Sequence, residues 1–313
     1  MMKRIFFILS QFCKVLPIEW YAKASNHNVI FPFYHIVCDE APGHIKHLYR
    51  TKSAADFESD LDFLLKHFEP ITFDEYLNRE RFDKPAMVLS FDDGLREFAD
   101  VAAPILLRKG VPAINFLNSD FIDNKELFYR YKASLLVEHL KCDKNTAKQI
   151  LSTGYKDRFS LDEMAKDAGL DYRSYLNSEQ PYLTTSQIEH LASQGFQFGA
   201  HSLSHPLYES ISEDEQIEQT LKCVDSLSSI QGTCKLFSFP FTDNGVKSSF
   251  FDSVYKQGVE YTFGTAGIKD DEQQRNIQRI PMEQDQYSAQ SILYGEYCYC
   301  LLRQLIRRNV VHH

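Results

Sequence analysis

Two groups of side chains in this sequence have types and spacing suited to hydrolysis at a metal ion. The first is the run Ser90-Phe91-Asp92-Asp93-Gly94, in which two adjacent carboxylates follow the apolar stretch 85–91. Neighbouring strand residues face opposite sides, but a turn at the strand end can bring both carboxylates into one pocket. One carboxylate could then bind a cation while the other accepts a proton. The alternative is that an aspartate here only caps the helix that follows.

The second group is His201-Ser202-Leu203-Ser204-His205, which follows the apolar stretch 196–200. Two imidazoles four residues apart lie on one face of a helical turn and can reach one ion. With 11 histidines in 313 residues, such a pair also arises easily by chance, so two unrelated surface histidines are the alternative. Two imidazoles and one carboxylate would leave an open ligand position, which is the pattern of a hydrolytic metal site.

The elements that must position these residues alternate between strand-like and helical patterns. Strands are expected at 28–34, 85–91, 112–117, 196–200, 235–241, 260–264 and 277–280, with helical spacing at 57–67, 95–109, 248–258 and 289–308 among others. This alternation predicts an α/β fold with a mostly parallel sheet, closed into a barrel. The segment from about 123 to 181 has helical patterns and no strand, and we interpret it as a helical insertion at a strand end.

Taken together, the motifs resemble the polysaccharide deacetylases of carbohydrate esterase family 4. SFDDG is similar to that family's first motif, HSLSH to its second, and FSFPFTDNG at 237–245 to its third, which is centred on a proline. The resemblance implies a distorted (β/α) barrel of the polysaccharide deacetylase type over residues 28–313, interrupted by the helical insertion.

The resemblance also implies roles for individual residues. Asp93, His201 and His205 would bind one divalent metal ion, with zinc expected and cobalt or nickel as alternatives. Asp92 would be the general base in removal of N-acetyl groups from an amino sugar. The substrate would be a carbohydrate, either a glycan or a lipid-linked glycan precursor.

The sequence departs from the family pattern at the general acid. Many members place a histidine in a late Leu-x-His motif, but the only histidines after His205 here are His312 and His313, which we expect to be disordered. Our candidate for the acid is His35, which follows the first strand. The alternative is that His35 is a buried structural histidine.

The third motif departs as well. The arginine that often steadies the base is replaced by Ser238, and Arg279 could supply that guanidinium unless it sits in a surface ion pair. We expect Pro240, Phe241 and Arg279 to contribute to substrate binding. A set of tyrosines in or beside the insertion could line one edge of the cleft: Tyr129, Tyr131, Tyr172, Tyr175 and Tyr182.

Two other activities remain open on the sequence. One is an amide hydrolase or deformylase acting on a non-polymer substrate, since the family fold also serves such reactions. The other is a carbohydrate-binding relative without catalysis, which the missing late histidine and Ser238 would explain.

Composition bears on partners and location. The formal net charge of −9 makes a nucleic-acid partner unexpected. Seven cysteines without a C-x-x-C pair suggest reduced thiols and a cytoplasmic location. Residues 1–27 are expected to form an amphipathic helical segment that packs on the body, lies on a membrane surface through residues 1–20, or is a cleaved signal. The oligomeric state is left open.

Overall fold

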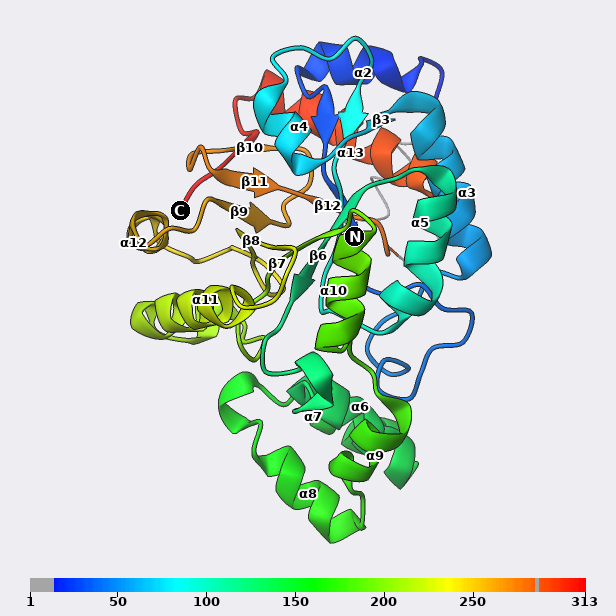
Figure 1. Cartoon of the computed structure of the whole chain (residues 1–313), viewed down its shortest axis with the longest axis vertical. Helices are drawn as coiled ribbons and strands as arrows, with labels where there is room; N and C mark the ends of the chain where they lie inside the picture. Colours follow the sequence, from blue (N-terminus) through cyan, green and yellow to red (C-terminus); the bar gives the residue numbers. More distant parts are fainter. Residues whose placement is uncertain (1–13, 285–286) are drawn as a thin grey trace.

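The centre of the molecule is a curled parallel sheet (Figure 1). The computed structural model describes residues 14–284 and 287–313, and within them eight parallel strands follow the order β11-β9-β8-β7-β6-β5-β2-β12. Their bounds are β2 Pro32–Tyr34, β5 Leu89–Phe91, β6 Ala113–Leu117, β7 Gln197–Ala200, β8 Thr233–Ser238, β9 Tyr261–Gly264, β11 Asn276–Gln278 and β12 Ile280–Pro281. The parallel sheet expected from the sequence is therefore confirmed.

The two edges of this sheet are joined through a single residue, Arg279. Its peptide N–H donates to Gly264 on the β9 side, whereas the N–H of Ile280 donates to Phe31 on the β2 side. The chain thus crosses from one edge of the sheet to the other and nearly closes the barrel, as the predicted (β/α) barrel requires.

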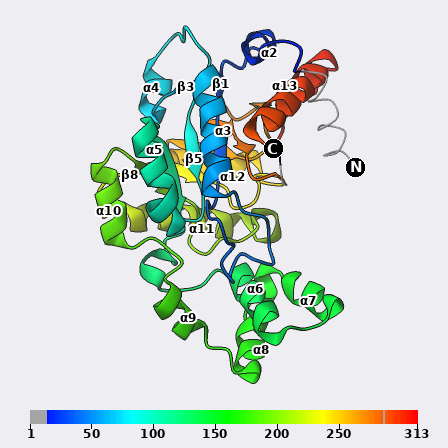
Figure 2. The same ribbon diagram turned by 90° about the vertical axis from the view of Figure 1, so that its right-hand side faces the viewer.

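Helices cover the outside of the barrel (Figures 1 and 2). They are α2 Ile18–Ser25, α3 Ala54–His67, α4 Phe73–Asn78, α5 Ala103–Lys109, α10 Thr185–Ser193, α11 Glu213–Leu227, α12 Ser248–Lys256 and α13 Ala289–Leu305. Most begin at a hydroxyl cap: Ser53, Thr72, Thr184, Ser212 and Ser288 each accept a backbone N–H of the first turn. Smaller sheets pair β1 Val29–Ile30, β3 Glu69–Pro70 and β4 Ala86–Met87, and β10 Asp270–Asp271 with β13 Val310–Val311.

The segment between β6 and β7 forms a helical lobe below the carboxyl ends of the strands (Figure 1). It contains α6 Tyr129–Leu140, α7 Lys144–Leu151, α8 Ser160–Ala168 and α9 Tyr172–Glu179. Its apolar side chains form a cluster that is separate from the main barrel core and also includes Ile36, Ile45, Leu95 and Ile211 from the barrel loops. The lobe therefore packs against the barrel mouth, where it can contribute side chains to a site.

Several local expectations differ from the structure. The helix expected at 95–109 starts as a π-helix at Phe98–Ala102, and the strand at 28–34 is split into β1 and β2. Cys298 is disulfide-bonded, which corrects the expectation that every cysteine is reduced, while the free cysteines in the described residues are Cys38, Cys142, Cys223, Cys234 and Cys300. Residues 1–13 of the expected N-terminal segment lie outside the described residues, and α2 is the part that follows them.

The C-terminal histidines are ordered, contrary to expectation. The side chain of His313 is 1% exposed and its Nε2 lies 3.1 Å from Oδ2 of Asp271. Backbone pairing of β13 with β10 carries the chain end to this position. Long-range strand pairing, which local sequence patterns do not report, therefore places His313.

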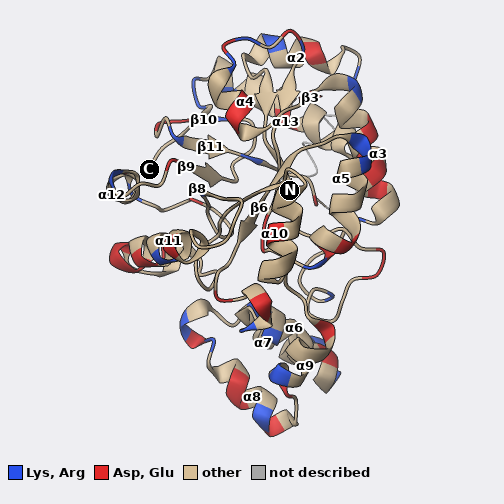
Figure 3. Ribbon diagram, viewed as in Figure 1, with Lys and Arg blue, Asp and Glu red and all other residues tan. Residues whose placement is uncertain are grey.

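Charged residues of both signs are spread over the helices and outer loops, while the barrel strands are largely uncharged (Figure 3). Among the described residues, none of the helices combines the length and apolar character needed to cross a bilayer.

Candidate active site

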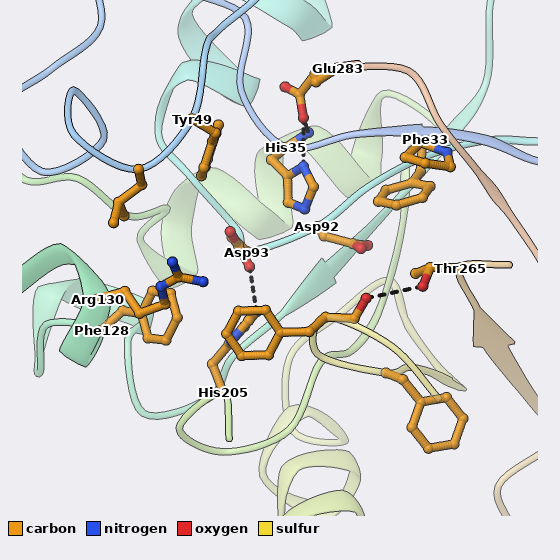
Figure 4. Close-up of a pocket in the computed structure, with 14 residues that line it drawn as sticks. Phe33, His35, Tyr49, Asp92, Asp93, Phe128, Arg130, His205, Thr265 and Glu283 are labelled. Carbon is orange, nitrogen blue, oxygen red and sulfur yellow. Dashed lines mark hydrogen bonds and ion pairs between the residues drawn. The ribbon is translucent and has the colours of Figure 1, made fainter. Parts of the chain in front are cut away.

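A cavity of about 350 Å³ opens at the carboxyl ends of the barrel strands (Figure 4). Its lining is Phe33, His35, Leu48, Tyr49, Asp92, Asp93, Phe128, Arg130, His205, Phe239, Phe241, Thr265, Pro281 and Glu283. The cavity thus gathers five of the residues singled out in the sequence. His201, Pro240 and Arg279 do not line it but are buried behind its wall.

Asp92 is held from behind by Arg279. The two guanidinium nitrogens Nη1 and Nη2 donate to Oδ1 and Oδ2 of Asp92 at 2.8 and 2.7 Å. Burial alone would raise the pKa of Asp92, but the Arg279 charge outweighs it and lowers that pKa below its ordinary value. Arg279 is 0% exposed, so the surface ion pair considered for it is excluded.

The Arg279 guanidinium is fixed in turn by the barrel interior. It donates to the hydroxyls of Ser90 and Ser238 and lies over the Phe33 ring at 4.2 Å. Ser238, which stands where the family often has arginine, therefore supports the arginine that reaches Asp92 from the β11–β12 junction. A bidentate pair in such a dry interior fixes the orientation of both carboxylate oxygens.

Asp93, His201 and His205 converge beside Asp92. Oδ1 of Asp93 lies 3.5 Å from Nε2 of His201 and 3.1 Å from Nε2 of His205. Two ligand atoms of a tetrahedral zinc ion, each about 2.0–2.1 Å from the metal, are separated by roughly 3.3 Å. The spacing of these three atoms therefore suits one small divalent ion.

The polar atoms around this triad support the same interpretation. Oδ1 of Asp93 is buried without a hydrogen-bond partner in the described residues. Nδ1 of His201 donates to the carbonyl of Ser238 at 2.8 Å, which leaves Nε2 free to bind a metal. Burial lowers the pKa of His205 despite the nearby Asp93 carboxylate, which favours the neutral ring that metal binding needs.

The backbone that carries these ligands is strained. Asp93 has φ of 74° and His205 has φ of 59°, values that L-residues seldom adopt. Gly94 follows at φ 62°, and a Cβ there would lie 2.8 Å from the Leu117 side chain. Asn118 steadies the second motif by donating to the carbonyls of His201 and Ser202. Such strain concentrates at functional sites, where surrounding contacts maintain it.

His35 stands on the opposite side of Asp92 and Asp93 from His205, and Glu283 holds it (Figure 4). Oε2 of Glu283 accepts from Nδ1 of His35 at 2.5 Å and from its peptide N–H at 3.0 Å, while Oε1 accepts from the N–H of Ile36. Burial alone would lower the pKa of His35, but the Glu283 carboxylate, with Asp93 and Asp92, raises it to about 9. His35 is thus protonated at neutral pH.

The family model for polysaccharide deacetylase matches residues 79–262, more than half of the chain. The chain belongs to the polysaccharide deacetylase family. A comparison with curated proteins found no match.

Solved structures share the deacetylase fold. A Streptococcus pyogenes deacetylase, solved with acetate, has a TM-score of 0.58 at 15% identity, covering 86% of this chain and 97% of that one. IcaB from Ammonifex degensii gives 0.57 at 14% identity, with coverages of 86% and 97%. A polysaccharide deacetylase from Bacillus cereus gives 0.56 at 15% identity, covering 85% and 68%. Family membership supports a carbohydrate deacetylase activity, whereas these distant likenesses concern the fold.

Sequence reasoning missed several residues of this candidate site. Glu283 lies 248 positions from His35, and no local pattern signals that contact. Arg130 lies in the first turn of α6 and Phe128 is the residue just before this helix, and neither of them was singled out from the sequence.

The expected row of cleft tyrosines is wrong. None of the five lines the cavity, and Tyr131 and Tyr182 are fully buried in the lobe core. Tyr131 nevertheless touches the site, because its hydroxyl donates to Oδ2 of Asp93 at 3.0 Å. The aromatic residues that do line the cavity come mainly from the barrel loops.

A second group of ligand-type atoms lies outside the cavity, at Asp243, Asp271 and His313. Both carboxylates already accept hydrogen bonds from the amides of Asn276 and Gln278. These bonds satisfy both carboxylates without an ion, and the contact of His313 with Asp271 anchors the C-terminal strand β13 to the group.

Proposed function

We propose that the chain is a metal-dependent hydrolase that removes N-acetyl groups from an amino sugar in a glycan or a lipid-linked glycan precursor. One observation carries the proposal. A carboxylate held by arginine, Asp92, and a protonated imidazole held by glutamate, His35, face the same cavity, with a ligand triad beside them.

Asp93, His201 and His205 would hold the ion, and the mix of imidazole and carboxylate suits zinc, with cobalt or nickel as alternatives. When bound, the ion would polarise the amide carbonyl and make a water molecule more acidic. Asp92 would accept the proton from the attacking water, since Arg279 keeps it ionised and oriented.

His35 would supply the second proton. An amide nitrogen leaves only after protonation, and His35 carries a proton at neutral pH because Glu283 stabilises its charged form. In this reaction water first adds to the carbonyl carbon and gives a proton to Asp92. The nitrogen then takes the His35 proton, the C–N bond breaks, and the products are the free amine and acetic acid. Phe239 and Phe241 would pack against the sugar. Pro240 and Arg279 do not line the cavity and would contribute to substrate binding indirectly, by supporting the residues that do.

The first test measures the metal content and the deacetylation rate of the wild type and of two variants. The purified chain should hold about one zinc-like ion, and His201→Ala should lose it. Asp92→Asn should keep the ion yet release acetate from N-acetylated glucosamine oligomers about 10²–10⁴ times more slowly. Unchanged turnover in Asp92→Asn would exclude it as the base, and no ion in the wild type after soaking with zinc, cobalt or nickel would exclude the metal site.

The same assay separates the alternative functions. Faster turnover of an N-formyl substrate would favour a deformylase. If the wild type binds glycan but cleaves no amide, the protein is a carbohydrate-binding relative without catalytic activity. His35 and Arg279 would fill the roles whose absence motivated that alternative, and this supports the enzyme.

A cytoplasmic location with peripheral membrane contact is part of the proposal. Val15, Leu16 and Trp20 are exposed beside Lys23, which suits peripheral contact with an anionic membrane. Sedimentation with anionic lipid vesicles tests this contact. A cytoplasmic location is tested by cell fractionation, and the disulfide at Cys298 counts against a reducing compartment.

A further inference from the structure

Arg130 places a positive charge in the cavity that none of the described residues neutralises. It lies on the first turn of α6 and lines the cavity, with its guanidinium directed inward (Figure 4). Among residues 14–284 and 287–313 it forms no ion pair within 4.0 Å and no side-chain hydrogen bond, and its guanidinium carbon lies 5.5 Å from the centre of the Phe241 ring. A ring contact of this kind orients the guanidinium while its N–H donors stay available.

The other charges of the cavity are already matched. Asp92 pairs with Arg279, and Glu283 pairs with His35. Asp93 does not form an ion pair with Arg130, because its Oδ2 accepts a hydrogen bond from Tyr131 and its Oδ1 faces the two histidines. Arg130 is therefore left without a protein anion beside it, and a divalent ion on Asp93 would give the cavity a net positive charge.

Much of the remaining lining is apolar, including Phe33, Leu48, Phe128 and Phe239. A cation among such side chains interacts more strongly with an opposite charge than it would in water. The planar fork of arginine matches a carboxylate or a phosphate through two parallel hydrogen bonds. A neutral sugar would leave this charge unused.

We propose that Arg130 is a specificity-determining residue that binds an anionic substituent, a carboxylate or a phosphate, on the sugar that carries the acyl group. This inference rests on the proposed function, since it names the substrate class of the same cavity. The helical insertion would then select substrates through Arg130.

Binding to the metal-free protein tests the proposal, because an anion could otherwise bind the metal itself. We would measure affinity by calorimetry for N-acetylglucosamine, N-acetylglucosamine 6-phosphate and N-acetylmuramic acid. The wild type should bind at least one anionic sugar about 10- to 100-fold more tightly than the neutral one. Tighter binding of the phosphate sugar or of the carboxylate sugar identifies which anionic group on the substrate Arg130 binds.

Three variants make the result specific. Arg130→Gln should abolish the preference, and Arg130→Lys should keep part of it. Lys125→Gln is the matched control, since Lys125 is an exposed cation of the same lobe outside the cavity. Thermal unfolding would verify that each variant is folded.

Equal affinities for all three sugars in the wild type, no binding of either anion at millimolar concentration, or a preference that survives in Arg130→Gln would overturn the inference. An anion preference without amide cleavage would remove only the proposed function. Cleavage of neutral and anionic substrates at equal rates, with no difference in binding, would remove only the inference.

Discussion

The hydroxyl of Tyr131 donates to Oδ2 of Asp93 across 3.0 Å, and this bond joins the helical lobe to a carboxylate at the end of β5. The lobe therefore supports the candidate metal ligand directly as well as covering the barrel mouth. Partners of this kind orient metal ligands and raise metal affinity.

Tyr131→Phe should weaken metal binding about 10- to 100-fold while the fold is retained, since it frees Asp93 to rotate. A competition titration with a metal indicator measures this. Tyr172→Phe is the control, because the Tyr172 hydroxyl donates to the Lys132 carbonyl within the same lobe, away from the cavity. Equal losses in both variants would mean that the lobe loosens as a whole.

Removal of the buried guanidinium should be costly. Arg279→Met leaves the Asp92 charge unpaired in the barrel and should lower the free energy of unfolding by about 3–5 kcal/mol. The double variant Asp92→Asn with Arg279→Met should recover part of this loss, measured by denaturant unfolding. No recovery would show that the cost comes from packing.

A second buried pair, Lys52–Asp60 at 2.8 Å, offers the matched comparison. Lys52→Met should also destabilise the fold because it leaves Asp60 unpaired. Lys52 lies outside the cavity, so turnover per folded molecule should not change.

Glu283→Gln should shift the pH profile. Glu283 raises the pKa of His35 to about 9, and an acid catalyst works only while it is protonated. Loss of the carboxylate lowers that pKa, so the alkaline limb of kcat/KM should move to lower pH. Glu272→Gln, which removes a surface partner of His312, should leave the limb in place. If the limb stays at the same pH in Glu283→Gln, His35 is not the acid.

Gly94→Ala tests the turn after the aspartate pair. The positive φ alone costs about 1–2 kcal/mol for an alanine, and contact with Leu117 adds to it. Gly110→Ala isolates the backbone cost, since Gly110 has φ of 68° and a Cβ there would contact nothing within 4 Å. Equal stability losses on thermal unfolding would rule out the steric part.

The sequence was most informative where chemistry is local. Asp92, Asp93, His201 and His205 stand in short motifs directly after apolar strands, and parallel strands bring such ends together. The alternation of strands and helices likewise predicted the barrel, because each crossover needs an intervening helix.

The partners that tune these residues were harder to foresee. Glu283 reaches His35, and Tyr131 reaches Asp93, through contacts between segments far apart in the chain. No periodicity records such contacts. Arg279 was recognised as a candidate only because its guanidinium could replace one missing at Ser238, and its burial followed from the barrel closure.

The crossing at Arg279 also bears on how the protein behaves at high concentration. Parallel sheets present unpaired backbone groups at their edges, and these recruit strands from other molecules. Here the outermost strands are short, β11 with three residues and β12 with two, and one residue connects them. The two edges therefore face each other around the barrel rather than neighbouring molecules, which limits intermolecular strand pairing and aggregation through this sheet.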